Sequence, residues 1–257
     1  MWNALLARSH DVRAATTVAL VVAVLLFAPV VAATWRVEGV AVPWIVASAA
    51  LELVYFLLLT TAYQRSDLSL VYPIARGSAP ILVLAGAALA GAAVGAWQAV
   101  GVILVGAGVI LVRGLSRPVD RRGVALSLAI GATIAGYTLV DKEGIEHAST
   151  LPYLELVLAP VAVATLAVQI ATKGAETVRA EMNWSAVLAG VLSFVAYALA
   201  LAALQLASAA SVAAVRETSI LFAVALGAII LREHVSLARI AGATLVVAGV
   251  ALVALAG

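Results

Sequence analysis

Long apolar runs dominate this sequence and restrict what it can fold into. Nine such runs follow one another, separated by charged or turn-forming residues. A helix of ~20 apolar residues matches the hydrocarbon thickness of a lipid bilayer. The runs are Ala14–Trp35, Val42–Tyr63, Leu68–Ala90, Gly95–Val112, Gly123–Val140, Thr150–Ala171, Trp184–Ala207, Ala210–Leu231 and Val235–Ala256. We therefore predict an all-α, polytopic membrane helix bundle with nine visible spans.

The composition excludes several other classes of protein. Hydrophobic residues make up 65% of the chain and charged residues only 11%, whereas a soluble domain has roughly 25% charged residues. The net charge is +2, and no basic patch is interleaved with aromatic side chains, so we expect no nucleic-acid partner. Because the chain has no cysteine, it forms no disulfide and no thiolate site.

Basic residues in the short loops predict the orientation. One set of loops receives Arg8, Arg13, Arg65, Arg113, Arg117, Arg121, Arg122, Lys173, Arg179, Arg232 and Arg239. The other set receives only Arg36 and Lys142. Positive charge favours the cytoplasmic side, so the first set lies in the cytoplasm and the C-terminus faces outward. We expect a multi-pass protein of the cell membrane, namely the inner membrane of a prokaryote.

An internal repeat indicates how the spans are organised. Residues 68–111 align with residues 208–252, which brings Arg76 opposite Arg216. After a one-residue shift, Gly101 and Gly108 stand opposite Gly242 and Gly249. An odd number of helices lies between the copies, so the second copy enters the membrane from the opposite side, and inverted repeats of this kind bind substrate near the midplane. We predict a first repeat of four spans over residues 1–113, a basic linker loop over 114–122 and a second repeat of five spans over 123–257.

Three stretches of sequence resemble a known family. They are Tyr63–Pro80 (YQRSDLSLVYPIARGSAP), Ala135–Gly144 (AGYTLVDKEG) and Arg216–Phe222 (RETSILF). These phrases are similar to the EamA-like branch of the drug/metabolite transporter superfamily. The resemblance implies ten helices in two inverted five-helix repeats, and secondary transport, commonly export, of metabolites or amphiphilic drugs. It also implies two cytoplasmic termini, which the loop charges contradict.

The first repeat shows one helix fewer than the second. The opening segment Met1–Arg8 resembles the closing turn of the family's first helix. We therefore expect that the first helix is missing from this chain. The alternative is a shortened variant that restores its cavity by pairing with another chain.

Five ionisable residues lie inside the predicted spans, where each is costly unless it is paired or faces water. They are Glu52, Arg76, Glu155, Arg216 and Glu217. One hypothesis is that Arg76 and Arg216 guard the two sides of a central cavity. The other is that they pair with Glu52 and Glu155 and hold helices in register. Glu217 points ~100° away from Arg216 around the helix, so the two need different neighbours.

Several tyrosines and one more acid, Asp141, complete the set of candidate cavity residues. Tyr72 lies one turn before Arg76, and Tyr55 shares a helix face with Glu52. Glu52 is a candidate proton carrier, the alternative being an ion pair with an arginine. Further candidates that could line the cavity, or merely pack, are Tyr137, Asp141, Tyr153 and Tyr197.

The four repeated glycines predict close helix packing. Gly101 and Gly108 share one face of their helix, as do Gly242 and Gly249 on theirs, and small residues let backbones approach closely in lipid. The glycines could pair the two repeats within one chain or pair two chains, so a monomer and a homodimer both remain open.

No enzyme motif accompanies these features. His10, His147 and His234 fall in loops, and the sequence has no metal-binding histidine pair, nucleophile elbow or phosphate-binding loop. We expect a protein that is not an enzyme and needs no metal or cofactor. The predicted function is secondary export of small metabolites or amphiphilic compounds by alternating access at a cavity between the repeats. The alternatives are uptake or exchange of small organic anions, and a non-transporting membrane scaffold.

Overall fold

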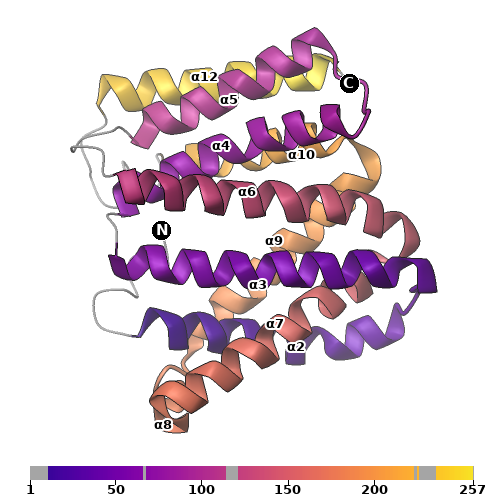
Figure 1. Ribbon diagram of the computed structural model, residues 1–257, viewed down its shortest axis with the longest axis vertical. Coiled ribbons are helices and arrows are strands. Elements are labelled where there is room, and N and C mark those ends of the chain that lie inside the picture. The colour runs from indigo at the N-terminus through magenta and orange to yellow at the C-terminus, as the bar shows by residue number, and fades with distance from the viewer. Residues whose placement is uncertain (1–10, 66–67, 114–120, 223–224, 226–235, 257) are drawn as a thin grey trace. The chain divides into compact units, whose positions relative to one another are not determined.

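Most of the described part of the chain is helical. The computed structural model describes residues 11–65, 68–113, 121–222, 225 and 236–256. The longer helices are α2 (Val12–Ala33), α3 (Val42–Arg65), α4 (Leu68–Leu89), α5 (Ala96–Arg113), α6 (Arg121–Gly144), α7 (Thr150–Lys173), α9 (Trp184–Leu206), α10 (Ala209–Arg216) and α12 (Leu237–Ala256) (Figure 1). Short helices are η1 (Gly39–Ala41), η2 (Ile145–His147) and α8 (Ala175–Ala180). The segment 1–10, which carries the hypothesis of a missing first helix, lies outside the described residues.

Six helices of the described part are long and apolar enough to cross a membrane. They are Val12–Ala33, Gly39–Ala62, Arg121–His147, Thr150–Lys173, Trp184–Leu206 and Leu237–Leu255. Two shorter apolar helices, Ile74–Leu89 and Ala96–Val112, belong to α4 and α5. Large apolar side chains such as Leu25, Leu57 and Leu199 are more than half exposed, as expected where lipid rather than water surrounds a helix. The prediction of a polytopic helix bundle is confirmed.

The eighth predicted span differs from expectation. It was predicted as one helix over Ala210–Leu231, but α10 ends at Arg216 and two turn residues follow before a helical segment resumes at 219–222. Most of the remaining part of this run lies outside the described residues.

Local chemistry sets the ends of α2 and α7. Asp11 caps α2 by accepting hydrogen bonds from the amides of Arg13 and Ala14, and it also forms an ion pair with Lys173 at the end of α7. Gly174 ends α7 with a φ of 82°, which other residues rarely adopt. Burial alone would raise the pKa of Asp11, but the hydrogen bonds from Lys173 and the two amides hold it below its ordinary value of 3.8.

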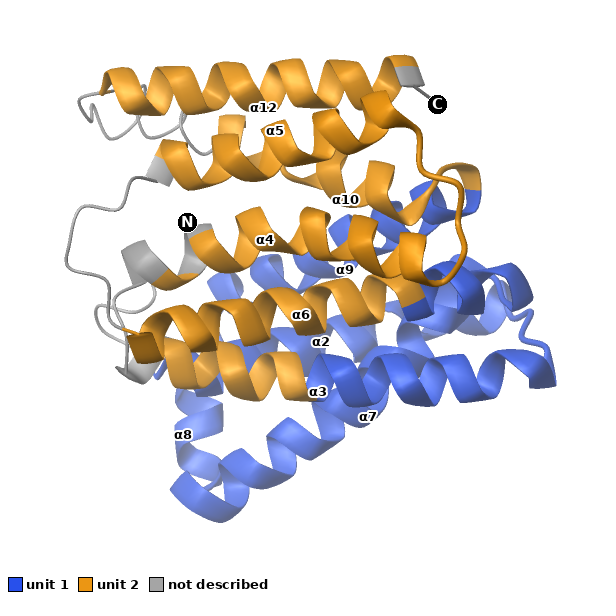
Figure 2. Cartoon of the chain, turned by 45° about the horizontal axis from the view of Figure 1, so that its top comes forward, with its two compact units in different colours: residues 1–53, 140–205 blue, residues 54–139, 206–257 orange. Residues whose placement is uncertain are grey.

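The chain divides into two compact units (Figure 2). Unit 1 comprises Met1–Leu53 and Val140–Gln205, and unit 2 comprises Val54–Leu139 and Leu206–Gly257. Each unit therefore combines segments from both predicted repeats, and the predicted linker at 114–122 does not separate the units. Helices α3 and α6 contribute residues to both.

Unit 1 is held together by α2, α7 and α9. The helices α2 and α9 approach so closely that a Cβ at Gly190 would collide with the backbone carbonyl of Ala19. Two rings on the same helices, Phe27 and Phe194, stack with centroids 4.2 Å apart. Van der Waals contact and aromatic stacking of this kind replace the hydrophobic effect as the source of helix association in lipid.

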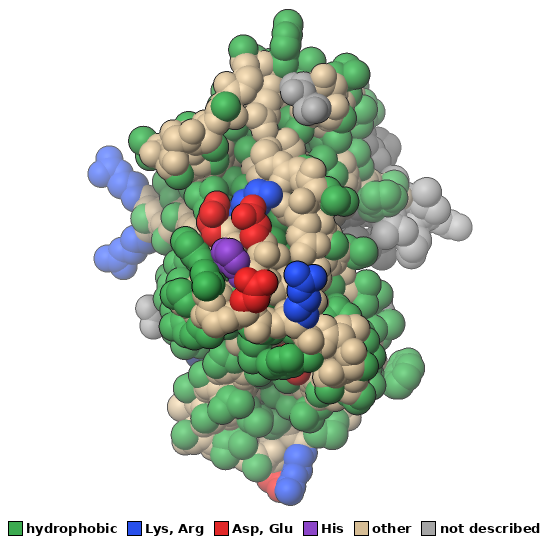
Figure 3. All heavy atoms as spheres, turned by 90° about the vertical axis from the view of Figure 1, so that its right-hand side faces the viewer, with side chains coloured by type: hydrophobic (Ala, Val, Ile, Leu, Met, Phe, Trp, Pro, Cys, Tyr) green, Lys and Arg blue, Asp and Glu red, His purple; other side chains and the backbone are tan. Residues whose placement is uncertain are grey.

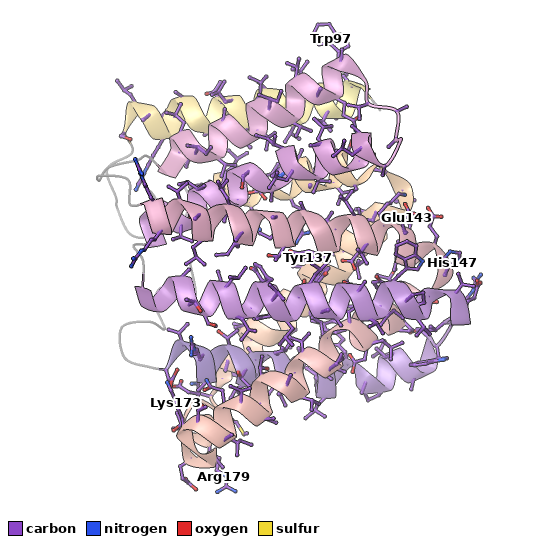
Figure 4. The ribbon with its side chains drawn as sticks, in the orientation of Figure 1. Trp97, Tyr137, Glu143, His147, Lys173 and Arg179 are labelled. Atoms are coloured by element: carbon purple, nitrogen blue, oxygen red, sulfur yellow. The ribbon has the colours of Figure 1, made fainter. Side chains whose placement is uncertain are left out.

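In unit 1, the loop that follows α2 is hydrogen-bonded to the loop that precedes α7. The amide of Glu38 donates to the carbonyl of His147 at 3.0 Å, and the amide of Ser149 donates to the carbonyl of Arg36 at 2.8 Å. Figure 3 shows acidic, basic and histidine side chains gathered in one patch on a face that is otherwise mostly hydrophobic. The ionisable residues of the two loops and the adjoining end of α6 are Arg36, Glu38, Lys142, Glu143, Glu146 and His147; Figure 4 labels Glu143 and His147.

Unit 2 is built around the close antiparallel pair α5 and α12. A Cβ added to Gly101 would lie 2.7 Å from the carbonyl oxygen of Gly249, and one added to Gly249 would lie 2.5 Å from that of Gly101. The same reciprocity links Gly108 and Gly242, at 2.6 and 2.7 Å. The four glycines thus face one another within the chain.

Candidate functional site

A buried carboxylate lies at the centre of unit 1. Asp141, near the end of α6, is 1% exposed and accepts three hydroxyl hydrogen bonds. Ser48 of α3 donates to Oδ1 at 2.6 Å, Tyr153 of α7 donates to Oδ1 at 3.0 Å, and Tyr197 of α9 donates to Oδ2 at 2.7 Å. Side chains from four helices therefore meet at one carboxylate.

The sequence around Asp141 makes this arrangement possible. A Cβ at Gly144 would lie 2.5 Å from the hydroxyl of Tyr153, so only glycine leaves room for that ring. The adjacent Lys142 directs its ammonium to the carbonyl of Leu204 at 2.7 Å. Three hydroxyl donors offset part of the cost of burying an ionised carboxylate. Ser48 was not among the candidates, although it lies one helical turn before Glu52.

Two further buried carboxyl groups of unit 1 lie on the long helices α3 and α7, and they differ. Glu52 on α3 is 3% exposed and interacts with neighbouring groups. Glu155 on α7 is 9% exposed, and its Oε2 is buried without a hydrogen-bond partner among the described residues.

The candidate site of unit 2 lies where α10 ends. Arg76 of α4 donates from Nε to Oε2 of Glu217 at 3.2 Å and from Nη2 to the hydroxyl of Ser219 at 3.4 Å. The Glu217 side chain is only 6% exposed. Arg216 lies at the end of α10 and Glu217 caps it, so the ion pair sits at the interruption of this helix.

Tight turns replace the α-helical pattern at this interruption. The amides of Glu217 and Thr218 donate to carbonyls three residues back, at 3.1 and 3.0 Å. The amides of Ile220 and Leu221 repeat the pattern, at 3.0 and 2.9 Å. Short 3₁₀ stretches inside a helix often mark functional hinges.

Two predicted tyrosines of unit 2 are brought together. The rings of Tyr55 and Tyr137 meet edge to face with centroids 6.0 Å apart, and Tyr137 is 5% exposed (Figure 4). The side chain of Tyr72 lies outside the described part. Among the described residues, no three acidic or histidine side chains are placed to hold a metal ion.

Apolar spanning helices with buried ionisable groups define the class as a polytopic membrane protein with polar sites inside its spans. The family model of the EamA-like transporter family matches residues 121–255, more than half of the chain. The chain belongs to the EamA-like transporter family, as its sequence phrases indicated, and is a multi-pass membrane transporter.

The fold of the chain is similar to that of a solved structure. The chain is similar to a protein whose structure is titled only "Crystal structure of protein", with 16% identity and a TM-score of 0.76, over 99% of this chain and 93% of that one. At this identity the likeness shows the fold alone. No protein with a curated description matches the chain.

Proposed function

We propose that the chain is a secondary transporter that exports small metabolites or amphiphilic compounds by alternating access. The observation that supports this most directly is the set of buried ionisable groups inside the spans of a transporter-family protein, above all the ion pair Arg76–Glu217 at the interrupted α10. Charged groups inside spans mark substrate and ion pathways because each is costly in hydrocarbon. Interrupted helices with unpaired backbone form the binding sites of many transporters.

The glycine contacts support an inverted repeat, on which alternating access would rest. The sequence alignment equates Gly101 with Gly242 and Gly108 with Gly249. In the contact Gly101–Gly249, each glycine can be replaced by its equivalent in the other repeat. The result is the contact Gly242–Gly108, which is the second glycine contact between α5 and α12. Self-complementary contacts of this kind are the mark of a twofold relation. The same glycines already contact one another within the chain, which favours pairing of the two repeats over homodimerisation through these glycines.

Uptake or exchange of organic anions is the second candidate. The side chain of Arg76 is 23% exposed, and its guanidinium is already bonded to the carboxylate of Glu217. An anionic substrate would compete with Glu217 for it, since guanidinium groups bind carboxylate and phosphate well.

The remaining parts of the proposal concern place and partners. The substrate is a small molecule, the location is the cell membrane of a prokaryote, and the loops rich in arginine face the cytoplasm. The protein contacts lipid and works as a monomer or a homodimer.

The test begins with the purified full chain. Thermal unfolding is measured against a library of metabolites and amphiphilic compounds, because a compound that binds the folded state raises the midpoint. Each compound that raises it is then used for flux in proteoliposomes. Flux that requires the chain and weakens in Arg216→Ala but not in Glu176→Gln, an exposed position, supports transport. Absence of both binding and flux across the library favours the scaffold alternative.

Export is separated from uptake and anion exchange by flux direction. Accumulation of the substrate inside everted membrane vesicles, whose lumen corresponds to the cell exterior, supports the proposal. Flux only of organic anions, and only with a counter-anion inside the vesicle, favours exchange.

A further inference from the structure

The three buried carboxyl groups on the long helices α3, α6 and α7 of unit 1 have different surroundings. Asp141 accepts three hydroxyl hydrogen bonds, and Glu52 interacts with its neighbours. Glu155 lies inside the span α7, 9% exposed, with no hydrogen bond or ion pair to any described residue. A carboxyl group buried inside a span is tolerated in one of two ways: hydroxyl donors stabilise it as an anion, or it binds a proton and is neutral.

We infer that Glu155 is a proton-binding site of this protein, protonated in the conformation described, and that it exchanges its proton with water during the transport cycle. The inference rests on the proposed transport function and names its coupling ion. It assigns the proton to Glu155 rather than to Glu52.

No cation among the described residues forms an ion pair with Glu155. Helix α2, which packs against α7, has no titratable residue between positions 14 and 33. Lys173, on α7 itself, lies 18 residues away, about 27 Å along the axis, and pairs with Asp11. The ionisable groups inside the neighbouring helices of unit 1 include Glu52 on α3, Asp141 and Lys142 on α6, and Tyr197 on α9, with Tyr153 on α7 itself. Lys142 is engaged elsewhere: it donates to the carbonyl of Leu204 at 2.7 Å and lies 3.9 Å from Glu146. The remaining groups are acids, so each one ionised would further disfavour a second negative charge at Glu155.

Glu155 on α7 and Asp141 on α6 thus differ in the number of hydrogen-bond donors around their carboxyl groups. Asp141 is surrounded by hydroxyl groups that donate to its oxygens, which suits an ionised carboxylate. Glu155 has no such donors, and an unpaired ionised carboxylate in a medium of low dielectric is far costlier than a neutral carboxylic acid. Pairs of acids whose surroundings differ in this way commonly divide protonated and ionised roles.

Helix α7 also contains a point where it can bend. Pro160 lies inside α7, five residues after Glu155, and has no amide hydrogen to give to the carbonyl of Leu156. Helix α2 carries Pro29 inside its own span. Proline sites are the usual positions of helix kinks, so a bend at Pro160 would move Glu155 relative to its neighbours and bring water to it.

Infrared spectroscopy tests the proton directly and needs no substrate. The full chain in lipid is measured at neutral pH for the C=O stretch of a protonated carboxylic acid. We expect this band in the unaltered protein, its loss in Glu155→Gln and its displacement in Glu155→Asp, which keeps a carboxyl group. The matched control is Glu176→Gln, whose carboxylate is 87% exposed on α8; it should retain the band.

Several results would overturn the inference. A missing band in the unaltered protein means that Glu155 is ionised, and a band that persists in Glu155→Gln belongs to another acid. Loss of the band in Glu52→Gln but not in Glu155→Gln assigns the proton to Glu52. Exchange into D₂O supplies the second measurement: a shift of the band shows that water reaches the site, whereas a band that never shifts marks a permanently enclosed acid.

These readouts are independent of flux. A band that behaves as expected in a protein without flux would contradict the proposed transport function and leave the proton site intact. A protein with flux but without the band would contradict only the proton site.

Discussion

The substitution Gly108→Ala should weaken the pairing of α5 with α12. The new Cβ would lie 2.6 Å from the carbonyl oxygen of Gly242 and 2.8 Å from the backbone nitrogen of Val246. Both are backbone atoms that cannot rotate away, so the helices must separate by roughly 1 Å to restore ordinary contact. Overpacking of this kind costs about 1–3 kcal/mol, and the better helix propensity of alanine returns up to ~1 kcal/mol. We expect a net loss of up to about 2 kcal/mol.

Thermal unfolding of the full chain in detergent measures this loss. For a protein of this size, ~2 kcal/mol lowers the midpoint by about 4–8 °C. The control is Gly95→Ala, in the same unit just before α5, where a Cβ meets nothing within 4 Å. The double variant Gly108→Ala/Gly242→Ala should lose less than the sum of the two single variants, because both methyl groups occupy one contact. Equal midpoints for Gly108→Ala and Gly95→Ala would refute the packing argument.

Three further predictions concern the charged groups. Asp141→Asn should lower the unfolding midpoint by the equivalent of about 1–3 kcal/mol, because an amide donates where the carboxylate accepted; an unchanged midpoint would mean that the hydroxyl network contributes little. Arg76→Ala should cost about 3–5 kcal/mol by leaving buried Glu217 without its partner, and adding Glu217→Gln should restore most of the stability; failure of that rescue would show that the lost contact is not the charge. The pKa of Asp11 is lowered in the folded chain, so ionised Asp11 contributes its full stabilisation of the fold above the ordinary pKa of 3.8 and loses it as the pH falls below that value. Lys173→Ala should therefore weaken the fall of the unfolding midpoint in acid, and an unaltered pH profile would contradict this.

The helical spans could be predicted because their signals are local. A backbone in lipid must satisfy its own hydrogen bonds, so a run of ~20 apolar residues can hardly be anything but a helix. The run Trp184–Ala207 and the helix Trp184–Leu206 differ by one residue at one end. The short phrases that resemble the EamA-like family are local as well, and the family match over residues 121–255 confirmed what they indicated.

The partners of the polar groups could be foreseen only in part. The spacing of Glu52 and Tyr55, or of Tyr72 and Arg76, predicts which side chains share a helix face, but not what the face meets. The sequence predicts Arg76 beside a cavity or opposite Glu52 or Glu155; the structure shows an ion pair of Arg76 with Glu217, which the sequence pattern did not indicate.

The sequence by itself thus determined the class and the six long apolar helices of the described part, since hydropathy and helix length act within about twenty consecutive residues. Tertiary structure alone decided the interruption after Arg216 and the network around Asp141. The first places Glu217 against a guanidinium 141 positions away along the chain, and the second joins Asp141 to a serine 93 positions away and to tyrosines 12 and 56 positions away. Contacts across such separations depend on how whole helices pack, and no local pattern in the sequence encodes which side chains will meet.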